Sequence, residues 1–464
     1  MNDASGRPYD VVVVGAGMTG SVTAGRAAEL GCRVLQLDTA EDSTAGGNTT
    51  LSGGGLHLAR SRFDADPEIL RDKILTRSIL GRIELIDVVA KTAGQTLGWI
   101  LEQGVELAPA APGDIECMLA PIRDLGDVHA WRDAGPQRAL RVLQQRFREH
   151  GGEIMPATRA VEFARGPSGE IAGVITEDGR RLAANAVMLA DGGFQANPEL
   201  RRRFISPNAD RMFLRGAPNS VGDGLLMAES AGAKLLNTEW FYGHILHRDV
   251  FENDKLWPWP GLDELLPRGA ILVDAHGARL ADEGRLPTVI VNAIGRSEDP
   301  RGATVIMDEE MWEASAGEWV WGHRAPNPEL VERGARLIRA DTLEDLAAQA
   351  GIDADGLTST LYFYDTAVAN DKASNLPIPR SGTARPLRPP YIALPAVAGI
   401  SHTMGGAMID DQMHVLDHDE RPIPGLYAAG PGTAGATVGY YGGFSEATTL
   451  GMSAAQTIAE ERRR

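Results

Sequence analysis

The sequence predicts an α/β protein with a discontinuous domain built on a parallel sheet and a second domain inserted into it. The chain has 464 residues, which is too long for one ordinary hydrophobic core. The four valines Val11–Val14 are typical of a strand that is buried on both faces of a parallel sheet. Between about residues 236 and 380, tryptophans and prolines become frequent. This change in composition indicates the inserted domain.

The chain begins with a complete strand–helix–strand unit. An apolar strand, Tyr9–Val14, leads into the glycine-rich segment 15–20 (GAGMTG), and an alanine-rich helix then extends to about Leu30 before Gly31. A second strand, Arg33–Leu37, ends at Asp38. A GxGxxG motif between strand and helix, with an acidic residue about 20 positions later, predicts a Rossmann-like dinucleotide-binding fold.

Each glycine of the motif has a mechanical reason. Gly15 permits the tight turn, Gly17 lets a pyrophosphate approach the backbone, and Gly20 allows the helix to pack closely on the strand. The helix N-terminus offers free N–H groups to the phosphates, and Asp38 can accept hydrogen bonds from the adenosine ribose. The dinucleotide site predicted here consists of Gly15, Ala16, Gly17, Thr19, Gly20 and Asp38.

The remaining chain divides into segments of different character. Residues 64–150 have apolar residues at helical spacing, whereas residues 154–190 contain short β-type segments with a probable hairpin turn at Asp178-Gly179. A strand over Val187–Ala190 ends on glycines, and the last helix starts near Ser445. We therefore expect residues 1–237 and 381–464 to form the nucleotide-binding domain, and residues 238–380 to form an α+β capping domain.

Composition excludes several classes of partner. The net charge of −18 argues against nucleic acid and anionic membrane surfaces as partners. No apolar segment is long enough to cross a bilayer, so we expect no integral membrane segment and, by default, a cytoplasmic location. The two cysteines, Cys32 and Cys117, exclude a disulfide framework, a cysteine-rich iron–sulfur site and a CxxCH haem attachment.

Five further segments, taken in order, resemble one family of flavoproteins. They are GGNTTLSGGG (46–55), LADGGF (189–194), GDG (222–224), HTMGG (402–406) and IPGLYAAG (423–430). The family comprises the flavoprotein subunits of fumarate reductases and succinate dehydrogenases, with 3-ketosteroid dehydrogenases and tricarballylate dehydrogenase. The resemblance implies an FAD domain interrupted by a mobile capping domain, and oxidation or reduction of a carbon–carbon bond next to a carbonyl.

The resemblance also assigns residues to the FAD, position by position. Ser445 and Glu446 open the last helix towards the flavin C2 carbonyl, where a helix N-terminus stabilises the anionic reduced flavin. Family members with covalent flavin carry a histidine just before their Gly-Gly pair; Ala45 stands there in this chain, so we expect non-covalent FAD. The family usually has threonine where this chain has Asp191, and glutamate where it has Pro431. The implied FAD contacts are Gly46, Gly47, Asn48, Thr49, Ser52, Gly53, Asp191, Gly192, Asp223, Gly430, Ser445 and Glu446.

A proton-transfer group is implied in the same way. Arg285 matches the arginine that transfers the proton in soluble fumarate reductases, although it follows the preceding Glu283 at a shorter spacing. Glu264 and Arg268 match the residues that relay protons to that arginine. Arginine is protonated in water, so it can serve only when desolvated beside other charges. The alternative is an ordinary surface ion-pair network.

Two histidines match the family's substrate-binding positions, and one tyrosine departs from the pattern. His402 and His244 match histidines that hydrogen-bond a substrate carboxylate or carbonyl, and Tyr242 could assist; both histidines could instead be structural. Dicarboxylate enzymes have an arginine clamp where this chain has Tyr440, and a tyrosine cannot form that bidentate contact. In 3-ketosteroid dehydrogenases a tyrosine at the similar place hydrogen-bonds a ketone oxygen. Packing is the alternative for Tyr440.

The predicted function is therefore an FAD-dependent dehydrogenase or reductase of a small-molecule carbonyl substrate. A ketone, an enone or a monocarboxylate fits the substitution at Tyr440 better than a dicarboxylate does. The electron donor or acceptor is a partner that the sequence does not identify. Two alternatives stay open, an FAD-dependent oxidase of hydroxy or amino acids and a flavin-binding protein without catalysis.

Overall fold

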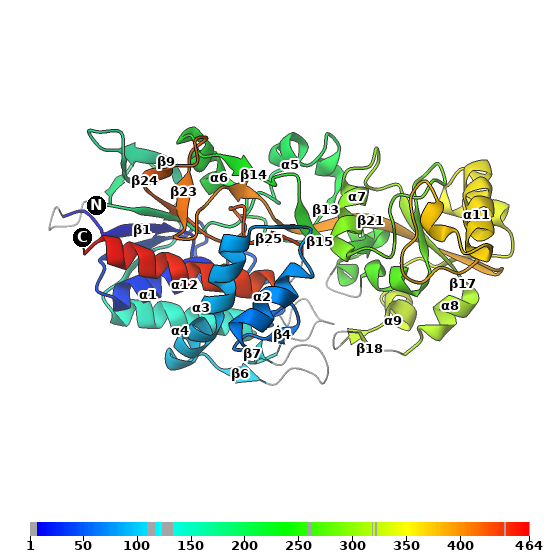
Figure 1. Ribbon diagram of the computed structural model, residues 1–464, viewed down its shortest axis with the longest axis horizontal. Helices are drawn as coiled ribbons and strands as arrows, with labels where there is room; N and C mark the ends of the chain where they lie inside the picture. Colours follow the sequence, from blue (N-terminus) through cyan, green and yellow to red (C-terminus); the bar gives the residue numbers. More distant parts are fainter. Residues whose placement is uncertain are drawn as a thin grey trace.

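The computed structural model describes residues 7–108, 117–122, 133–257, 261–317, 319–320, 323–439 and 442–463. The molecule is elongated, with two parts joined by the long strand β21, which reaches from one part into the other (Figure 1). Both ends of the chain lie on the same part, far from the second one (Figure 1). That part contains the strand–helix–strand unit predicted at the start of the chain.

A mixed six-stranded sheet forms the centre of the first part. Five of its strands are parallel to one another, and the sixth, the edge strand β23, runs antiparallel to its neighbour. All four valines of β1 are buried, as expected for a central strand of a parallel sheet. In spatial order the strands are β23 (His414–Leu416), β24 (Pro422–Ala428), β12 (Val187–Leu189), β1 (Val11–Val14), β2 (Val34–Leu37) and β8 (Glu153–Met155).

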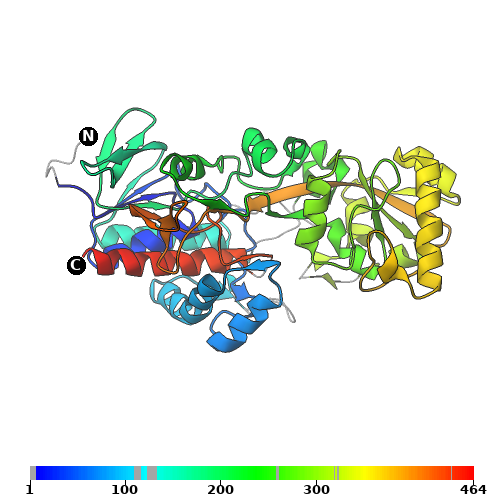
Figure 2. The same cartoon turned by 45° about the horizontal axis from the view of Figure 1, so that its top comes forward.

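Helices cover one face of this sheet and a small antiparallel sheet covers the other (Figure 2). The helix that follows β1 packs between the C-terminal helix and a third helix, and the small sheet contains the hairpin turn predicted at Asp178-Gly179. The helices on this face are α1 (Met18–Glu29), α4 (Gly135–Glu149) and α12 (Gly443–Glu461); α3 (Ile83–Glu102) packs on α12, and α2 (Pro67–Leu75) packs on α3. A further helix, α6 (Asp223–Ser230), contacts the small sheet instead. The small sheet consists of β9 (Ala160–Arg165), β10 (Ile171–Thr176) and β11 (Arg181–Ala183).

The second part is built around β21 (Tyr391–Thr403), which pairs with four other strands. Helices surround this sheet at the far end of the molecule (Figure 1). The sheet contains β13 (Phe213–Leu214), β15 (Phe241–His247), β16 (Ile271–Val273), β17 (Ala303–Asp308) and β20 (Ile338–Ala340) beside β21. The helices are α5 (Pro198–Phe204), α7 (Pro287–Gly295), α8 (Glu309–Ala314), α9 (Pro326–Glu332), α10 (Leu343–Ala350) and α11 (Ala354–Ala369).

Short elements complete the described chain. The strands of this kind are β3 (His57–Leu58), β4 (Ser61–Arg62), β5 (Leu80–Gly81), β6 (Leu107–Ala108), β7 (Met118–Leu119), β14 (Leu235–Leu236), β18 (Trp319–Val320), β19 (His323–Arg324), β22 (Gly406–Ala407) and β25 (Thr437–Val438). The 3₁₀ helices are η2 (Ala209–Arg211), η3 (Arg248–Phe251), η4 (Asp254–Leu256), η5 (Leu262–Glu264), η6 (Leu266–Arg268) and η7 (Ala373–Asn375).

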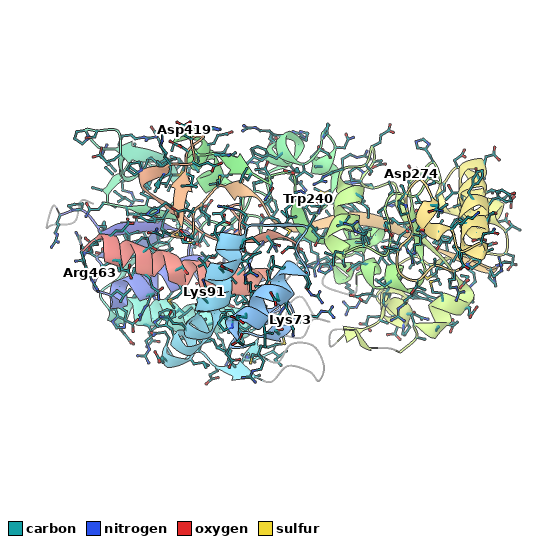
Figure 3. All side chains as sticks on the ribbon, viewed as in Figure 1. Lys73, Lys91, Trp240, Asp274, Asp419 and Arg463 are labelled. Atoms are coloured by element: carbon teal, nitrogen blue, oxygen red, sulfur yellow. The ribbon has the colours of Figure 1, made fainter. Side chains whose placement is uncertain are left out.

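Two separate hydrophobic cores correspond to the two parts. The second core includes Phe194 and Leu225 before the expected insertion, and Leu387 and Ile400 after it. The segment that packs as the cap thus extends beyond 238–380 on both sides, because β13 and β21 belong to its sheet. Trp240 lies at the junction of the two parts (Figure 3), where the Arg296 guanidinium lies 4.4 Å from the Trp240 ring centroid.

The α/β fold class and the nucleotide-binding unit predicted from sequence are confirmed. The helix after the glycine motif ends where the sequence placed its end, with Leu30 as C-cap and Gly31 at a φ of 90°. The final helix begins two residues earlier than expected, at Gly443. Among the described residues, no helix is long and apolar enough to span a membrane.

Candidate active site

The glycine-rich turn after β1 is packed so tightly that side chains are excluded. A Cβ on Gly15, which has a φ of 104°, would lie 2.4 Å from the Ala190 carbonyl oxygen. A Cβ on Gly20 would lie 2.0 Å from the Gly15 carbonyl oxygen, whereas one on Gly17 would meet only Thr49 Oγ1, at 3.2 Å. Gly15 and Gly20 therefore serve protein packing, and Gly17 faces the more open side, where a pyrophosphate would approach.

The N-terminus of α1 fits an anionic ligand. The N-cap residue, Gly17, has no side chain to cap the helix. The Met18 N–H donates to Thr49 Oγ1 at 2.9 Å, but the N–H groups of Thr19 and Gly20 have no partner within the described chain. Unpaired N–H groups at the positive end of a helix dipole are the usual environment of a nucleotide phosphate. These residues therefore fit the pyrophosphate of FAD.

The Asp38 carboxylate connects the glycine-rich turn to the loop after β2. Its two oxygens accept the N–H groups of Ala16 and Ala40, each at 2.8 Å. Burial raises the pKa of this carboxyl, although the two hydrogen bonds oppose the rise. Each oxygen keeps a further lone pair, so ribose hydroxyls can still be accepted.

Replacement of Asp38 by alanine is expected to weaken FAD retention by about 1–3 kcal/mol, because hydrogen bonds to a charged acceptor are lost. The measurement is the FAD dissociation constant of deflavinated protein. The matched control is Glu41→Ala, which removes an exposed carboxylate three residues further along. Equal affinity in the two variants would contradict a ribose contact by Asp38.

The loop that follows, residues 46–55, is held by its polar side chains and leaves space beside its glycines. Asn48 Nδ2 donates to the Ser401 carbonyl at 2.7 Å, and Asn48 Oδ1 accepts the Ala217 N–H at 2.6 Å. A Cβ on Gly47 or Gly53 would meet nothing within 4 Å. Asn48 thus connects this loop to the end of β21.

Several of the other predicted FAD contacts have protein partners of their own. Asp191 Oδ2 accepts the Gly224 N–H at 2.8 Å, and burial, with the charge of Asp223, raises the Asp191 pKa to about 6. Asp223 forms a bidentate ion pair with Arg159, both contacts at 2.7 Å. Gly192 and Gly430 both have left-handed backbone, with φ of 89° and 85°.

The N-cap residue of α12 is Gly442, which has no side chain to cap the helix. Two side chains of the first turn hold the helix in place. Ser445 is buried, and its Oγ accepts the His57 N–H at 3.0 Å. Glu446 Oε1 accepts the Ala436 N–H at 2.6 Å. Both side chains therefore fix the helix, and the helix N-terminus itself is the feature that fits a flavin carbonyl.

Next to this helix end, β15 and β21 bring a tyrosine and a histidine together. Tyr242 and His402 are direct partners in the antiparallel register, and their ring centroids are 5.0 Å apart. A register shift follows at Gly243, where a Cβ would lie 1.9 Å from the Gly399 carbonyl oxygen. A Cβ on Gly443 would lie 3.3 Å from His402 Nε2, so His402 reaches the first turn of α12.

A second histidine continues this polar surface. The Tyr242 hydroxyl and His244 Nε2 are 3.0 Å apart, and His244 Nδ1 lies 3.3 Å from Asp263 Oδ2. Asp263 is buried, and its other oxygen accepts the Ile245 N–H at 3.2 Å. The Arg215 guanidinium donates to Ser401 Oγ at 3.2 Å, and its positive charge interacts with Tyr242 and Asp263.

Burial keeps both histidines uncharged near neutral pH. Desolvation, with a smaller effect of His244, lowers the pKa of His402 to about 4. Desolvation also lowers the pKa of His244, against the opposing charge of Asp263, and the Arg215 charge adds to the lowering. Neutral imidazoles present one donor and one acceptor each, which suits a carbonyl ligand.

The predicted arginine relay is not assembled by hydrogen bonds in this structure. Arg285 is exposed, one residue before the N-cap of α7, and its side chain has no partner in the described part of the chain. Glu264 and Arg268 are partly buried in η5 and η6 and do not bond Arg285. Tyr440 lies outside the described residues, so its role stays a prediction from sequence.

Sequence reasoning missed Asp263 and Arg215. Asp263 directly precedes the predicted Glu264, and nothing in the spacing distinguishes the two carboxylates. Arg215 follows β13 in a segment without a motif. Only the pairing of β15 and β13 with β21 brings these charges to the histidines.

Residues 10–446 match the sequence family described as the FAD binding domain. The chain belongs to this family. This flavoprotein is therefore an FAD-dependent oxidoreductase, and its similar proteins are named as reductases and dehydrogenases. It is 26% identical to a fumarate reductase (cytochrome) of Shewanella frigidimarina, over 92% of this chain and 72% of that protein. It is 29% identical to the 4-oxocyclohexanecarboxylate 2-dehydrogenase of Sinomonas cyclohexanicum, over 97% and 93%.

Solved structures show the same fold for this flavoprotein. The 3-ketosteroid-Δ4-(5α)-dehydrogenase of Rhodococcus jostii RHA1 superposes with a TM-score of 0.72 at 22% identity, covering 97% of each chain. An open flavocytochrome c3 fumarate reductase gives a TM-score of 0.67 at 24% identity, covering 98% of this chain and 79% of that one. At these identities the likeness concerns the fold alone.

Proposed function

We propose that this flavoprotein binds FAD non-covalently and oxidises or reduces a carbon–carbon bond next to a carbonyl group. The observation that carries the proposal is the polar surface of Tyr242, His244 and His402 beside the uncapped N-terminus of α12. When bound, FAD supplies hydride transfer to or from carbon. The chain itself supplies hydrogen-bond donors for a carbonyl oxygen and a group for the accompanying proton.

The charge of this surface favours a ketone, an enone or a monocarboxylate. His244 and His402 are neutral, and Arg215 is a cation that interacts electrostatically with Tyr242 and Asp263. A dicarboxylate needs two charge-complementary clamps, since a buried carboxylate facing neutral groups costs several kcal/mol. The similar 4-oxocyclohexanecarboxylate 2-dehydrogenase supports the proposal, because its name describes a substrate with one ketone and one carboxylate.

The test starts with the purified, FAD-loaded protein. Acid or heat is expected to release all of its flavin as FAD, because Ala45 replaces the histidine of covalently flavinylated members. Flavin that stayed attached to denatured protein would contradict the non-covalent proposal. For the substrate screen, the flavin of the native protein is photoreduced without oxygen. Ketones, enones and unsaturated acids are then tested for their ability to reoxidise it. The proposed reaction requires rapid reoxidation by at least one conjugated carbonyl compound, or bleaching of oxidised enzyme by its saturated counterpart.

A further inference from the structure

Tyr242 and His244, on one face of β15, form a hydrogen-bonded relay with Asp263, and the direction of its hydrogen bonds can be deduced. A carboxylate oxygen can only accept a hydrogen bond, so His244 Nδ1, 3.3 Å from the Asp263 carboxylate oxygen Oδ2, must carry the ring proton. The neutral imidazole then has its lone pair on Nε2. Tyr242, whose hydroxyl lies 3.0 Å from Nε2, therefore donates its proton to His244.

Burial protects the hydrogen bonds of this relay from competing water. The side chains of His244 and Asp263 are only 12% and 5% exposed. Asp263 is further held by the Ile245 N–H, so both of its oxygens are fixed by β15. Such a carboxylate–imidazole–hydroxyl arrangement sets the tautomer of the histidine and stabilises the imidazolium that forms when the hydroxyl gives up its proton.

The Tyr242 end of the relay faces the expected place of the flavin. Tyr242 lies opposite His402 in the strand register, and His402 reaches the first turn of α12. Among the described residues, the charged or titratable groups that interact with the relay include Arg215, which faces Tyr242 and Asp263 from the end of β13, and His402 on β21. The positive charge of Arg215 opposes protonation of His244 at rest and favours any negative charge on the Tyr242 oxygen.

We propose that Tyr242 is the catalytic acid/base, with His244 as its proton acceptor and Asp263 as the positioning residue. This inference rests on the proposed function. In the direction of dehydrogenation, the Tyr242 oxygen takes a proton from the carbon next to the carbonyl, and the Tyr242 proton passes to His244 Nε2. The electron pair of that C–H bond forms the C=C bond as the neighbouring carbon loses a hydride, for which oxidised FAD, when bound, would be the acceptor. Reduction is the same sequence reversed.

The kinetic test compares Tyr242→Phe with Tyr391→Phe. The second variant loses a hydroxyl at the opposite end of β21 and is expected to behave as wild type. With FAD bound, Tyr242→Phe is expected to slow flavin reduction or reoxidation by substrate by a factor on the order of 10² to 10⁴, with little change in KM. A wild-type rate in Tyr242→Phe overturns the proposal. A decrease in rate of that size in Arg285→Ala, together with a wild-type rate in Tyr242→Phe, also overturns the proposal, because Arg285 would then transfer the proton.

The positioning role of Asp263 is tested with Asp263→Asn, which preserves shape and removes the charge. The asparagine amide would favour the other His244 tautomer, with the proton on Nε2, so that the ring could no longer accept from Tyr242. The rate is expected to fall on the order of 10²-fold and to recover partly as pH rises and the phenol ionises unaided. A loss that does not vary with pH overturns the role of Asp263.

A second readout needs no substrate and is therefore separable from the proposed function. Proteins labelled with ¹⁵N-histidine are compared by NMR, and the His244 signals are assigned with His244→Gln. Wild-type protein is expected to show neutral His244 protonated on Nδ1, and Asp263→Asn to show it protonated on Nε2. A wild-type Nε2–H tautomer overturns the relay even if the carbonyl screen succeeds. Failure of the screen alone, with the expected tautomers, overturns the proposed function.

Discussion

Replacement of Tyr440 by phenylalanine is expected to slow the chemical step with a ketone or enone substrate by roughly 10- to 1000-fold, as loss of one oxyanion-type donor does. The hydroxyl is predicted to polarise the carbonyl oxygen, in the place where dicarboxylate enzymes hold an arginine. Rapid-reaction measurement of flavin reoxidation, with FAD-loaded protein at saturating substrate, gives this rate directly. The adjacent Tyr441→Phe is the matched control and is expected to change it little.

The same substitution predicts the behaviour of the wild-type protein with dicarboxylates. Fumarate reduction and succinate oxidation are expected to be negligible, since one of the two carboxylates would face a neutral phenol. Efficient turnover of fumarate would mean that another cation, such as Arg215 near His244 and His402, supplies the missing clamp. The preference for a ketone would then have to be abandoned.

Replacement of Glu283 by glutamine is expected to destabilise the protein by about 3–5 kcal/mol, because breaking a buried ion pair leaves charges uncompensated. The Glu283 side chain is fully buried between Arg279 and Arg380, of which Arg380 is also fully buried. Glu283 Oε1 accepts the Leu272 N–H at 3.0 Å, and Oε2 accepts from Arg380 at 3.1 Å. The carboxylate therefore neutralises charge inside the second core.

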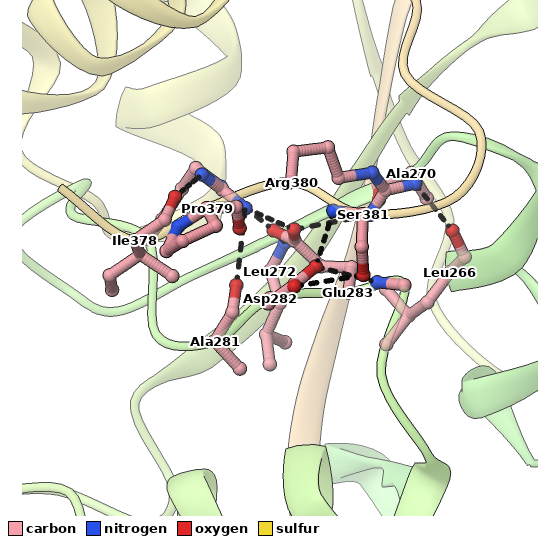
Figure 4. A network of polar contacts seen from close by, with 12 residues as sticks. Leu266, Ala270, Leu272, Ala281, Asp282, Glu283, Ile378, Pro379, Arg380 and Ser381 are labelled. Carbon is pink, nitrogen blue, oxygen red and sulfur yellow. Dashed lines mark hydrogen bonds and ion pairs between the residues drawn. The ribbon is translucent and has the colours of Figure 1, made fainter. Parts of the chain in front are cut away.

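The network around Glu283 joins three chain segments, and the third, which contains Arg380, lies 97 residues beyond Glu283 (Figure 4). Arg380 donates to the Leu266 carbonyl at 2.8 Å, and Ser381 donates twice to Asp282, each bond at 2.8 Å. Loss of the central charge should therefore loosen all three segments together, including the loop that carries Arg285.

Chemical denaturation of the FAD-saturated variants measures this effect. The matched control is Glu310→Gln, whose carboxylate is 79% exposed and lies 3.4 Å from Arg385. An exposed ion pair of this kind contributes at most about 1 kcal/mol. Equal destabilisation by the two substitutions would contradict the assignment of Glu283 as the buried counter-ion of the cap.

Local patterns predicted the first part of the molecule well, because its elements follow from neighbouring residues. Val11–Val14, the glycine-rich turn and the helix up to Gly31 form a unit whose strand, turn and helix are each specified within a few positions. Gly20 leaves no room for a Cβ because the Gly15 carbonyl oxygen would lie 2.0 Å away, which is a packing requirement within the motif itself. The family relationship follows from the same motifs and is confirmed by the match over residues 10–446.

The extent of the cap could not be read from composition. The second core takes in Phe194 and Leu225, which precede the tryptophan-rich region, because strand pairing and not composition decides which segments share a sheet. The 13 residues of β21 likewise pair with β13, which precedes that region, and with β15, β17 and β20 inside it. Such long-range pairing has no signal in a single sequence.

The sequence by itself determined the dinucleotide fold, because its motif is local, and the resemblance to the family predicted the two histidines and the tyrosine at the substrate. Tertiary structure alone decided which charges meet these residues. Asp263 reaches His244 because η5 packs beneath β15, and Arg215 reaches the same group because β13 pairs with the end of β21. Arg285, which the motif favoured, is exposed instead. Hydrogen-bond partners depend on distances between segments far apart in the chain, and such distances exist only in the folded protein.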